Sequence, residues 1–531
     1  MADLETNVSV PVLDDPINES EMKSAFKDMK KAGYDIHLPI LDTLVTYFSI
    51  TLLMMLNFMF YVKYPVQLSL SLLSLIPKAG NLALSNNYRG IQMMKSLACL
   101  FDRIITNRLK LWLPFHIDQT AFQKLKSTLL HIFTLRILIE LAKKNKTTLY
   151  IGSMDLSKAF DNVDRLLLLK KLIKLGVGKY MLHALKQLYR ITNCIIQFGG
   201  EFSSVFPMHS GIRQGAASSV LLFNSFMDDL FKHLGEGCAT ETLLQDIHTL
   251  IHADDTIILS TCRQKFIHKC NMAIDFFHSN KLKLNIGKCK YTVINPGKND
   301  KTSLILKGGT LKYTNTLKYL GIYITSSGSI RSDVKYYLDK LSYISTIDYP
   351  NFCKLNKNAP LHIKLLVLDK CVVSSLIYAC EVWGNHYRDV EPIYRCCIKT
   401  ALGIRPGTNN EIVYIEAGKH PLEGRIKSLQ HKFWSKMINY TNDNPDSAIA
   451  KVLRAGRACN LSYLRYYSDL HREFSNPRFC ENSIDARYRS VWRQAIVGAS
   501  VDPDSKLGTY FRVNPELKPF VTPPNILEGE R

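Results

Sequence analysis

Two apolar stretches of the chain lead into carboxylates that a buried core does not readily accept. Residues 147–154 are rich in Thr, Leu, Tyr and Ile and predict a buried strand, which Asp155 follows directly. The stretch TLIHADDTIILST predicts a hairpin with Asp254 and Asp255 at its tip. Within a strand, adjacent aspartates would point to opposite faces, and one would be buried without a partner. The pattern therefore favours a fold that places these carboxylates at a strand end and a turn.

Carboxylates brought from separate elements to one place suit magnesium-dependent nucleotidyl transfer. Magnesium prefers carboxylate oxygens and keeps some water or phosphate ligands. Two such ions, about 3.5–4 Å apart, can activate an attacking hydroxyl and support a leaving pyrophosphate. An isolated Asp-Asp pair is more often an ordinary solvated turn, so the interpretation depends on the whole ordered set of motifs.

The remaining pattern alternates strands, helices and hairpins before it becomes helical and basic from Ser329 to about residue 440. This order predicts an α+β fold. The expected elements are a strand in VQLSLSLLSLIP, a helix over 164–176, a hairpin around Gly199 and Gly200, a helix in GAASSVLLFNSFMDDLFKHLGEG, a helix over 265–280, and one hairpin formed by SLILKGGTLKY and LKYLGIYIT around Gly308 and Gly309.

Composition indicates a polyanionic partner. The net charge is +22 with a pI near 9.3, which favours binding to nucleic acid or to an anionic membrane surface. Thirteen cysteines without a C-x-x-C pair argue against a zinc ribbon and fit reduced thiols inside a cell. The N-terminus shows no secretory signal. We therefore expect an intracellular protein, with nucleus or cytoplasm left open.

Residues 43–62 contain no charge and are about as long as a membrane-spanning helix. Several Thr, Ser and Asn residues make the segment only moderately apolar. A buried helix is the favoured interpretation, and a protein anchored in a membrane is the alternative.

Five motifs occur in the order MDLSKAFD, GIRQGAASSVLLFN, IHADDTIILS, LKLNIGKCKYTVI and LKYLGIYI. In this order they resemble the palm motifs of reverse transcriptases from non-LTR (LINE-type) retrotransposons. The upstream segment LIPKAGNLALSNNYRGIQMMKSLACLFDRIITNRL resembles the fingers motif, and SLIYACEVWG and IEAGKHPLEGRIKSLQHKFW resemble the region after the polymerase. The resemblance covers about residues 15–440.

The resemblance implies a right-hand polymerase with fingers, a palm containing an antiparallel sheet, and a helical thumb. The expected boundaries are an N-terminal segment and fingers over 1–145, the palm over 146–325, a helical thumb and post-polymerase region over 326–440, and a basic C-terminal extension and tail over 441–531. The chain begins close to the fingers, so we expect no endonuclease ahead of them. No ribonuclease H constellation or zinc knuckle is recognisable after residue 440.

The resemblance also implies roles for single residues. Asp155, Asp254 and Asp255 match the ligands of two Mg²⁺ ions, with Mn²⁺ as an alternative ion. Lys288 lies in the motif that can protonate the pyrophosphate leaving group. His252 stands where many relatives have Tyr or Phe, and we expect it to supply a flat ring and not a metal ligand.

Four further residues match the nucleotide-binding positions of the family. Lys78 and Arg89 match fingers residues near the triphosphate, and Gln214 lies in the RQG step that lines the incoming nucleotide and template. Phe160, five residues after Asp155, matches the aromatic residue that closes off the sugar 2′ position. The alternatives are a core role for Phe160 and plain solvated charges for the two cations.

Other acidic residues have structural interpretations. Asp161 and Asp164 are expected to be helix-start residues, and Asp228 and Asp229 are expected to be structural because they lie within a helix.

The favoured hypothesis is an RNA-directed DNA polymerase of a retrotransposon. Its partners would be an RNA template, a DNA primer and dNTPs, without stable membrane association. One alternative is an inactive reverse-transcriptase-like protein that binds nucleic acid. Another is an RNA-templated RNA polymerase, which Phe160 and the RQG step disfavour because such enzymes usually place a carboxylate near the sugar.

Overall fold

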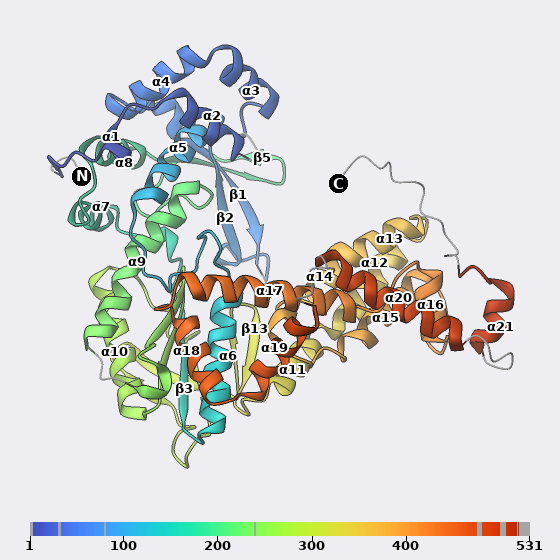
Figure 1. Ribbon diagram of the computed structural model, residues 1–531. Helices are drawn as coiled ribbons and strands as arrows, with labels where there is room; N and C mark the ends of the chain where they lie inside the picture. The colour runs from blue at the N-terminus through green and yellow to red at the C-terminus, as the bar shows by residue number, and fades with distance from the viewer. Residues whose placement is uncertain are drawn as a thin grey trace.

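A six-stranded sheet lies at the centre of the computed structural model, in the strand order β10-β11-β9-β3-β8-β7 (Figure 1). All neighbouring strands are antiparallel except β9 and β11, which are parallel. The strands are β3 (Leu149–Met154), β7 (Thr249–His252), β8 (Asp255–Ser260), β9 (Lys290–Ile294), β10 (Leu304–Leu306) and β11 (Gly309–Tyr313). The structure describes residues 4–29, 33–78, 81–237, 241–474, 481–499, 506–517 and 519.

Strand β3 separates two hydrophobic cores. Its side chains alternate, so that Tyr150 and Met154 enter one core while Leu149 and Ile151 enter the other. The first core is shared with helices α9 (Ala217–Gly237) and α10 (Arg263–Ser279), and the second with α6 (Thr128–Lys144). Burial on both faces fixes the register of β3 and therefore the position of the residue that follows it.

Helix α10 packs closely on the sheet and is joined to it by a buried ion pair. A Cβ atom at Gly152 would lie 2.6 Å from the Phe266 ring, so glycine permits this approach. Lys269 Nζ lies 3.3 Å from Glu241 Oε1, and both side chains are almost fully buried. Lys269 also donates to the Leu259 carbonyl in β8. These contacts hold the strand whose other end carries Asp255.

A second sheet, in the order β2-β1-β4-β5, lies apart from the first (Figure 1). The predicted hairpin at Gly199 and Gly200 is present between β4 and β5, and β6 also pairs with β4. The strands are β1 (Leu70–Pro77), β2 (Tyr88–Met93), β4 (Asn193–Phe198), β5 (Glu201–Phe202) and β6 (Phe206–Pro207). The helices of this region are α1 (Pro11–Asp14), α2 (Glu19–Lys27), α5 (Ser96–Trp112), α7 (Arg165–Lys174) and α8 (Lys179–Arg190).

Residues 43–62 do not form the single helix expected from their composition. The backbone leaves the helical conformation at Phe48, which separates α3 (Leu38–Tyr47) from α4 (Ser49–Tyr61). No single helix among the described residues is long and apolar enough to cross a membrane; these two pass that test only together, and they are bent by 99°. The Asn57 side chain bonds both backbone groups of Ile17, which ties α4 to the N-terminal segment.

The segments SLILKGGTLKY and LKYLGIYIT were expected to form one hairpin, and this expectation is wrong. They belong to two hairpins, β10–β11 and β12–β13, where β12 is Thr316–Tyr319 and β13 is Ile322–Thr325. The second turn uses left-handed backbone at Leu320 (φ 44°) and Gly321 (φ 82°). A turn at this position closes β12 directly onto β13.

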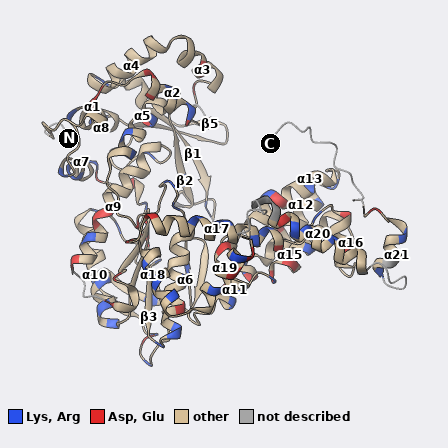
Figure 2. Ribbon diagram, in the orientation of Figure 1, with Lys and Arg blue, Asp and Glu red and all other residues tan. Residues whose placement is uncertain are grey.

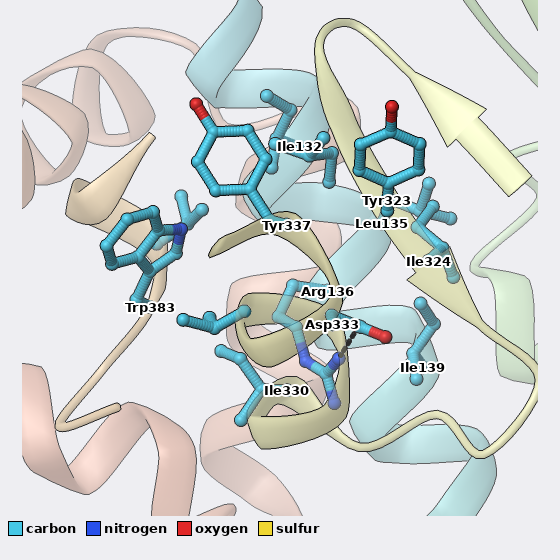
Figure 3. A pocket seen from close by; sticks show the side chains of 13 residues that line it. Ile132, Leu135, Arg136, Ile139, Tyr323, Ile324, Ile330, Asp333, Tyr337 and Trp383 are labelled. Carbon is cyan, nitrogen blue, oxygen red and sulfur yellow. Dashed lines mark hydrogen bonds and ion pairs between the residues drawn. The ribbon is translucent and has the colours of Figure 1, made fainter. Parts of the chain in front are cut away.

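A buried polar network connects α6, the end of β13 and helix α11 (Ile330–Tyr343) (Figure 3). Arg136 Nη1 lies 3.0 Å from Asp333 Oδ2. Arg136 Nη2 donates to the Gly328 carbonyl at 2.6 Å. Asp333 in turn accepts from the Thr325 backbone at 2.7 Å. The small cavity beside this network is lined largely by apolar residues of the same elements. The network holds the β12–β13 hairpin against the helices that follow it.

The second half of the chain is helical, as predicted, and extends away from the central sheet (Figure 1). One of its helices returns to the sheet region, because α18 packs against α6. The helices are α12 (Tyr349–Leu355), α13 (Leu361–Val367), α14 (Ser374–Leu376), α15 (Val390–Leu402), α16 (Asn410–Glu416), α17 (Glu423–Asp443), α18 (Ala448–Ala458), α19 (Ser462–Phe474), α20 (Glu481–Ala499) and α21 (Lys506–Val513). The predicted C-terminal tail falls mostly outside the described residues.

The buried ion pair between Lys269 and Glu241 predicts that removing one partner strongly destabilises the protein and that removing the second charge restores most of the stability. Lys269→Met leaves Glu241 charged and unpaired, so the free energy of unfolding should fall by about 3–5 kcal/mol. Adding Glu241→Gln removes the orphan charge and should recover most of this loss. Chemical denaturation of both variants measures the difference. An equal loss in the single and double variants would show that the charge is not the cause.

Candidate active site

Asp155 is the first residue after β3, as predicted, and a loop from another part of the chain fixes its backbone. Its N–H donates to Cys289 Sγ at 3.3 Å, and its carbonyl accepts from the Asn285 N–H at 2.8 Å. The same loop carries Lys288, whose charge opposes the upward shift that burial imposes on the pKa of Asp155. The structure thus brings together Asp155 and Lys288, two residues that sequence reasoning placed in one site.

The β7–β8 hairpin presents the adjacent aspartates at its tip, as predicted. His252 pairs with Asp255, so Ala253 and Asp254 form a two-residue turn. Ala253 adopts a left-handed φ of 54°. This conformation costs a non-glycine residue about 1–2 kcal/mol, and the surrounding structure must hold it in place. The His252 ring nitrogen Nδ1 lies 2.8 Å from the Thr120 hydroxyl, so this ring anchors the hairpin.

The three carboxylates share one electrostatic environment. Burial raises the pKa of Asp255, and the charges of Asp254 and Asp155 raise it further, to about 6. Burial also raises the pKa of Asp254, which the charge of Arg89 counteracts. Within the described part of the chain, none of the three forms an ion pair with a Lys or Arg side chain. Mutual repulsion without a paired cation is the electrostatic character of a cation-binding site.

The carboxylates fit a divalent cation by their chemistry, although their side chains do not converge on one point. Among the described residues, no group of three or more His, Cys, Asp or Glu side chains is arranged to hold an ion between them. Hard oxygen ligands from a strand end and a hairpin tip are nevertheless the donor type that magnesium prefers. The donor set and its unrelieved repulsion support a cation site here.

A glycine-dependent loop joins the second sheet to the carboxylate region. Gly215 has a φ of 126°, and a Cβ atom there would lie 2.4 Å from the carbonyl oxygen of Gln92 in β2. The Gln92 N–H donates to the Gln214 carbonyl at 2.7 Å. Gly211, with a φ of 79°, similarly lies against the backbone of Asp161. Glycine at both positions allows this loop to contact two other segments by backbone alone.

Gln214 and Phe160 are each held by a contact with another segment of the chain. Gln214 Nε2 donates to Asp161 Oδ1 at 3.0 Å, so Asp161 positions the glutamine from the first turn of a short 3-10 helix (Phe160–Asn162). The half-buried Phe160 ring stacks on Phe223 of α9, with ring centroids 4.5 Å apart. Asp164, in contrast, caps α7 as predicted by accepting from the Leu167 N–H at 2.9 Å.

Lys78 and Arg89 are exposed and influence the site through their charges. The charge of Arg89 lowers the pKa of Asp254, and that of Lys78 lowers the pKa of Asp161, against the larger effect of burial in each case. Arg89 is therefore near Asp254, and Lys78 is near Asp161, the residue that holds Gln214. The expectation that Asp228 and Asp229 are structural is also confirmed, since Asp228 accepts from the His116 N–H and Asp229 pairs with Lys171.

Sequence reasoning missed Asp102, which caps the helix after the RQG step. This fully buried residue of α5 accepts from the Ala217 N–H at 2.7 Å and from the Ser218 N–H at 3.2 Å. Its carboxylate also bonds the Ser218 hydroxyl. It thereby satisfies the first backbone donors of α9 and fixes the loop before it. An Asp within the apolar helical stretch FDRIITNRL was the available signal.

It also missed the buried imidazole of His131, which links several elements. The His131 ring contacts the Tyr319 hydroxyl at 3.2 Å and the Asp118 carbonyl at 2.9 Å. Burial lowers its pKa to about 3, so the ring is neutral at physiological pH. It holds β12 beside the Thr120–His252 contact.

Comparisons with known proteins show which family and which proteins the chain is similar to. Residues 76–324 match a family described as "Reverse transcriptase (RNA-dependent DNA polymerase)". The "Retrovirus-related Pol polyprotein from type-1 retrotransposable element R2" of Popillia japonica is 26% identical over 357 residues, which are 64% of this chain and 48% of that protein. The "RNA-directed DNA polymerase from mobile element jockey" of Drosophila melanogaster is 23% identical, over 56% of this chain and 33% of that protein.

Among solved structures, telomerase from Candida albicans aligns with a TM-score of 0.39 and 14% identity, covering 77% of this chain and 65% of that chain. The chain spans about half the length of the R2 protein and a third of the length of the jockey protein.

Because the pKa of Asp255 is raised, replacing its carboxylate with a neutral amide should stabilise the protein at high pH but not at low pH. Folding favours the protonated form of this side chain, so its charge costs stability as the pH rises through about 6. Asp255→Asn should raise the melting temperature at pH 8, by about 1–3 °C, and the gain should vanish below pH 4. Thermal melts with a chelator present test this, with Asp339→Asn at an exposed position of α11 as the matched control. A pH-independent gain would contradict the electrostatic explanation.

Proposed function

Because residues 76–324 are a reverse transcriptase domain of the kind found in non-LTR retrotransposons, we propose that this protein copies RNA into DNA. The reaction is nucleotidyl transfer from a dNTP to the 3′-hydroxyl of a DNA primer paired with an RNA template. The observation that supports this most directly is the set of three unpaired carboxylates at the end of β3 and the tip of the β7–β8 hairpin. Such a set can hold the cations that neutralise the charge developing in phosphoryl transfer.

Asp155, Asp254 and Asp255 would hold the divalent cations, which we propose to be two Mg²⁺ ions, with Mn²⁺ as an alternative. When bound, these ions neutralise charge on the transferring phosphoryl group and favour ionisation of the attacking hydroxyl. The protein contributes the rigid placement of the carboxylates. Strand β3 is buried on both faces and therefore fixes the position of Asp155. The Thr120–His252 contact anchors the hairpin that presents Asp254 and Asp255.

The other site residues bind and orient the nucleotide in this proposal. Arg89 and Lys78 would attract the triphosphate, since the charge of Arg89 acts on Asp254 and that of Lys78 acts on Asp161, the partner of Gln214. Gln214, held by Asp161, would line the pocket for the incoming base and sugar. Lys288, whose charge acts on Asp155, would donate a proton to the departing pyrophosphate.

Asp254→Asn should abolish primer extension on an RNA template while leaving template binding nearly unchanged. The loss of a cation ligand removes transition-state stabilisation of several kcal/mol, so extension should fall by roughly a thousandfold or more. Extension rates and template affinity are measured in parallel, with Asp339→Asn as the control of equal charge change. Substantial extension by Asp254→Asn in magnesium would remove this residue from the catalytic set.

Phe160→Ala should reduce the preference for deoxyribonucleotides. The wild-type ring is fixed by its stack on Phe223 and can act as a wall beside the sugar 2′ position. Overpacking against such a wall costs about 1–3 kcal/mol, which corresponds to roughly a ten- to hundredfold preference. Phe160→Tyr keeps the ring and should keep most of the preference. The ratio of dNTP to rNTP incorporation efficiency on one primer and template is the measurement; a ratio that does not change in an active Phe160→Ala variant would assign the ring to the core.

A further inference from the structure

Helix α20 lies in the C-terminal helical region, away from the central sheet (Figure 1), and its side chains line a groove along one face of the helix. Its volume is about 570 Å³, far more than a single small anion needs. It is lined by His420, Ala486, Arg489, Ser490, Arg493, Gln494 and Val497. Figure 2 shows Lys and Arg positions in this helix and its neighbours.

The lining residues of α20 recur at helical spacing and form one continuous stripe. Residues three or four positions apart share a helix face, so Arg489 and Arg493 lie one turn apart with Ser490 and Gln494 beside them. The two arginines are separated by about 6 Å along the helix axis. The stripe therefore presents repeated cations and hydrogen-bond donors in a line and not around a point.

The groove is electropositive, and not all of its positive charge is neutralised. Arg489 pairs with Asp485, whereas Arg493 forms no ion pair with any described residue. Burial and the charges of Arg489 and Arg493 lower the pKa of His420 to about 4, and Lys419 acts in the same direction while Asp485 opposes it. Two cations thus face the groove beside an imidazole that they keep neutral.

The imidazole of His420 also has unused hydrogen-bonding capacity. Its Nδ1 atom is buried and has no hydrogen-bond partner among the described residues. The ring is held edge-on to Trp492 with centroids 5.3 Å apart, so its orientation is fixed.

We propose that the α20 groove binds the phosphate backbone of a nucleic-acid strand, as a second nucleic-acid site distinct from the polymerase site. Arginine side chains at successive turns match a polymer with regularly repeated negative charges. Ser490 and Gln494 can bond phosphate or sugar oxygens, and Val497 offers apolar contact to a sugar. The lining residues extend along α20 from Ala486 to Val497, which favours a strand over an isolated anion, and the net charge of +22 favours the same polyanionic ligand. Such a site would retain a strand independently of catalysis.

The test compares two variants of equal charge change in the full chain. Arg489→Gln/Arg493→Gln removes the groove cations, and Arg465→Gln/Arg472→Gln removes two exposed cations of α19 as the control. Fluorescence anisotropy with a labelled single-stranded RNA should show a roughly tenfold loss of affinity for the groove variant. The slope of log affinity against log salt should become shallower by about 1.4, since each lost phosphate contact on a single strand contributes about 0.7. Equal behaviour of the two variants would overturn the proposal.

A second variant keeps both arginines and guards against a folding defect. Ser490→Asp places a carboxylate in the groove and should weaken RNA binding to a similar extent, while thermal melts stay unchanged. Unchanged RNA binding in a folded Ser490→Asp variant would also overturn the proposal.

Parallel titrations identify the ligand. Single-stranded RNA, duplex DNA and an RNA–DNA hybrid distinguish the source of the strand, because the groove variant should lose most affinity for the preferred one. Poly-glutamate is titrated as a polyanion without phosphate. If the groove variant lost as much affinity for poly-glutamate as for RNA, the groove would be a site for acidic peptides and the proposal would fail. RNA binding is measured without nucleotides and does not require polymerase activity. The result therefore tests the groove even if the proposed polymerase function is wrong.

Discussion

Repulsion among Asp155, Asp254 and Asp255 is the constraint on which the rest of the site depends. Burial raises the pKa of each carboxylate, and the charge of Asp254 raises the pKa of Asp155 and Asp255 further. A fold tolerates such a cluster only if rigid elements on every side hold it. Here β3 is packed between two cores, and the β7–β8 hairpin is anchored through His252. The stability of both cores is therefore used to maintain a locally unfavourable arrangement.

Backbone contacts between distant segments complete the site. Gly215 lies against the carbonyl of Gln92, and Asp102 caps the helix that begins two residues later. These contacts link the second sheet, α5 and α9 without any large side chain between them. A side chain at Gly215 would clash with the Gln92 carbonyl, so the loop or β2 would have to shift. The placement of two residues proposed to bind the nucleotide depends on this contact, because Arg89 lies on β2 and Gln214 lies on the loop.

The helical second half is connected to the central-sheet region by polar groups as well as by packing. Arg136 and Asp333 join α6 to α11, and Asp333 also holds the end of β13. Helix α18 packs on α6, so the C-terminal region contacts the element that covers one face of the sheet. Helix α20, whose side chains line the groove, lies farther along the same helical region (Figure 1). A strand bound there and a strand in the palm could therefore be held by one continuous body of helices.

The sequence alone determined the local features of the site. Apolar runs bounded by turn residues located β3 and the β7–β8 hairpin, and the residues at their ends followed from the alternation of side chains along a strand. Ordered motifs predicted the reverse transcriptase family and placed Asp155 beside Lys288. Only the tertiary structure showed the break at Phe48, the cap supplied by Asp102 and the groove on α20. These features arise from contacts between segments that are far apart in the chain, and local periodicity contains no information about which distant segments will meet.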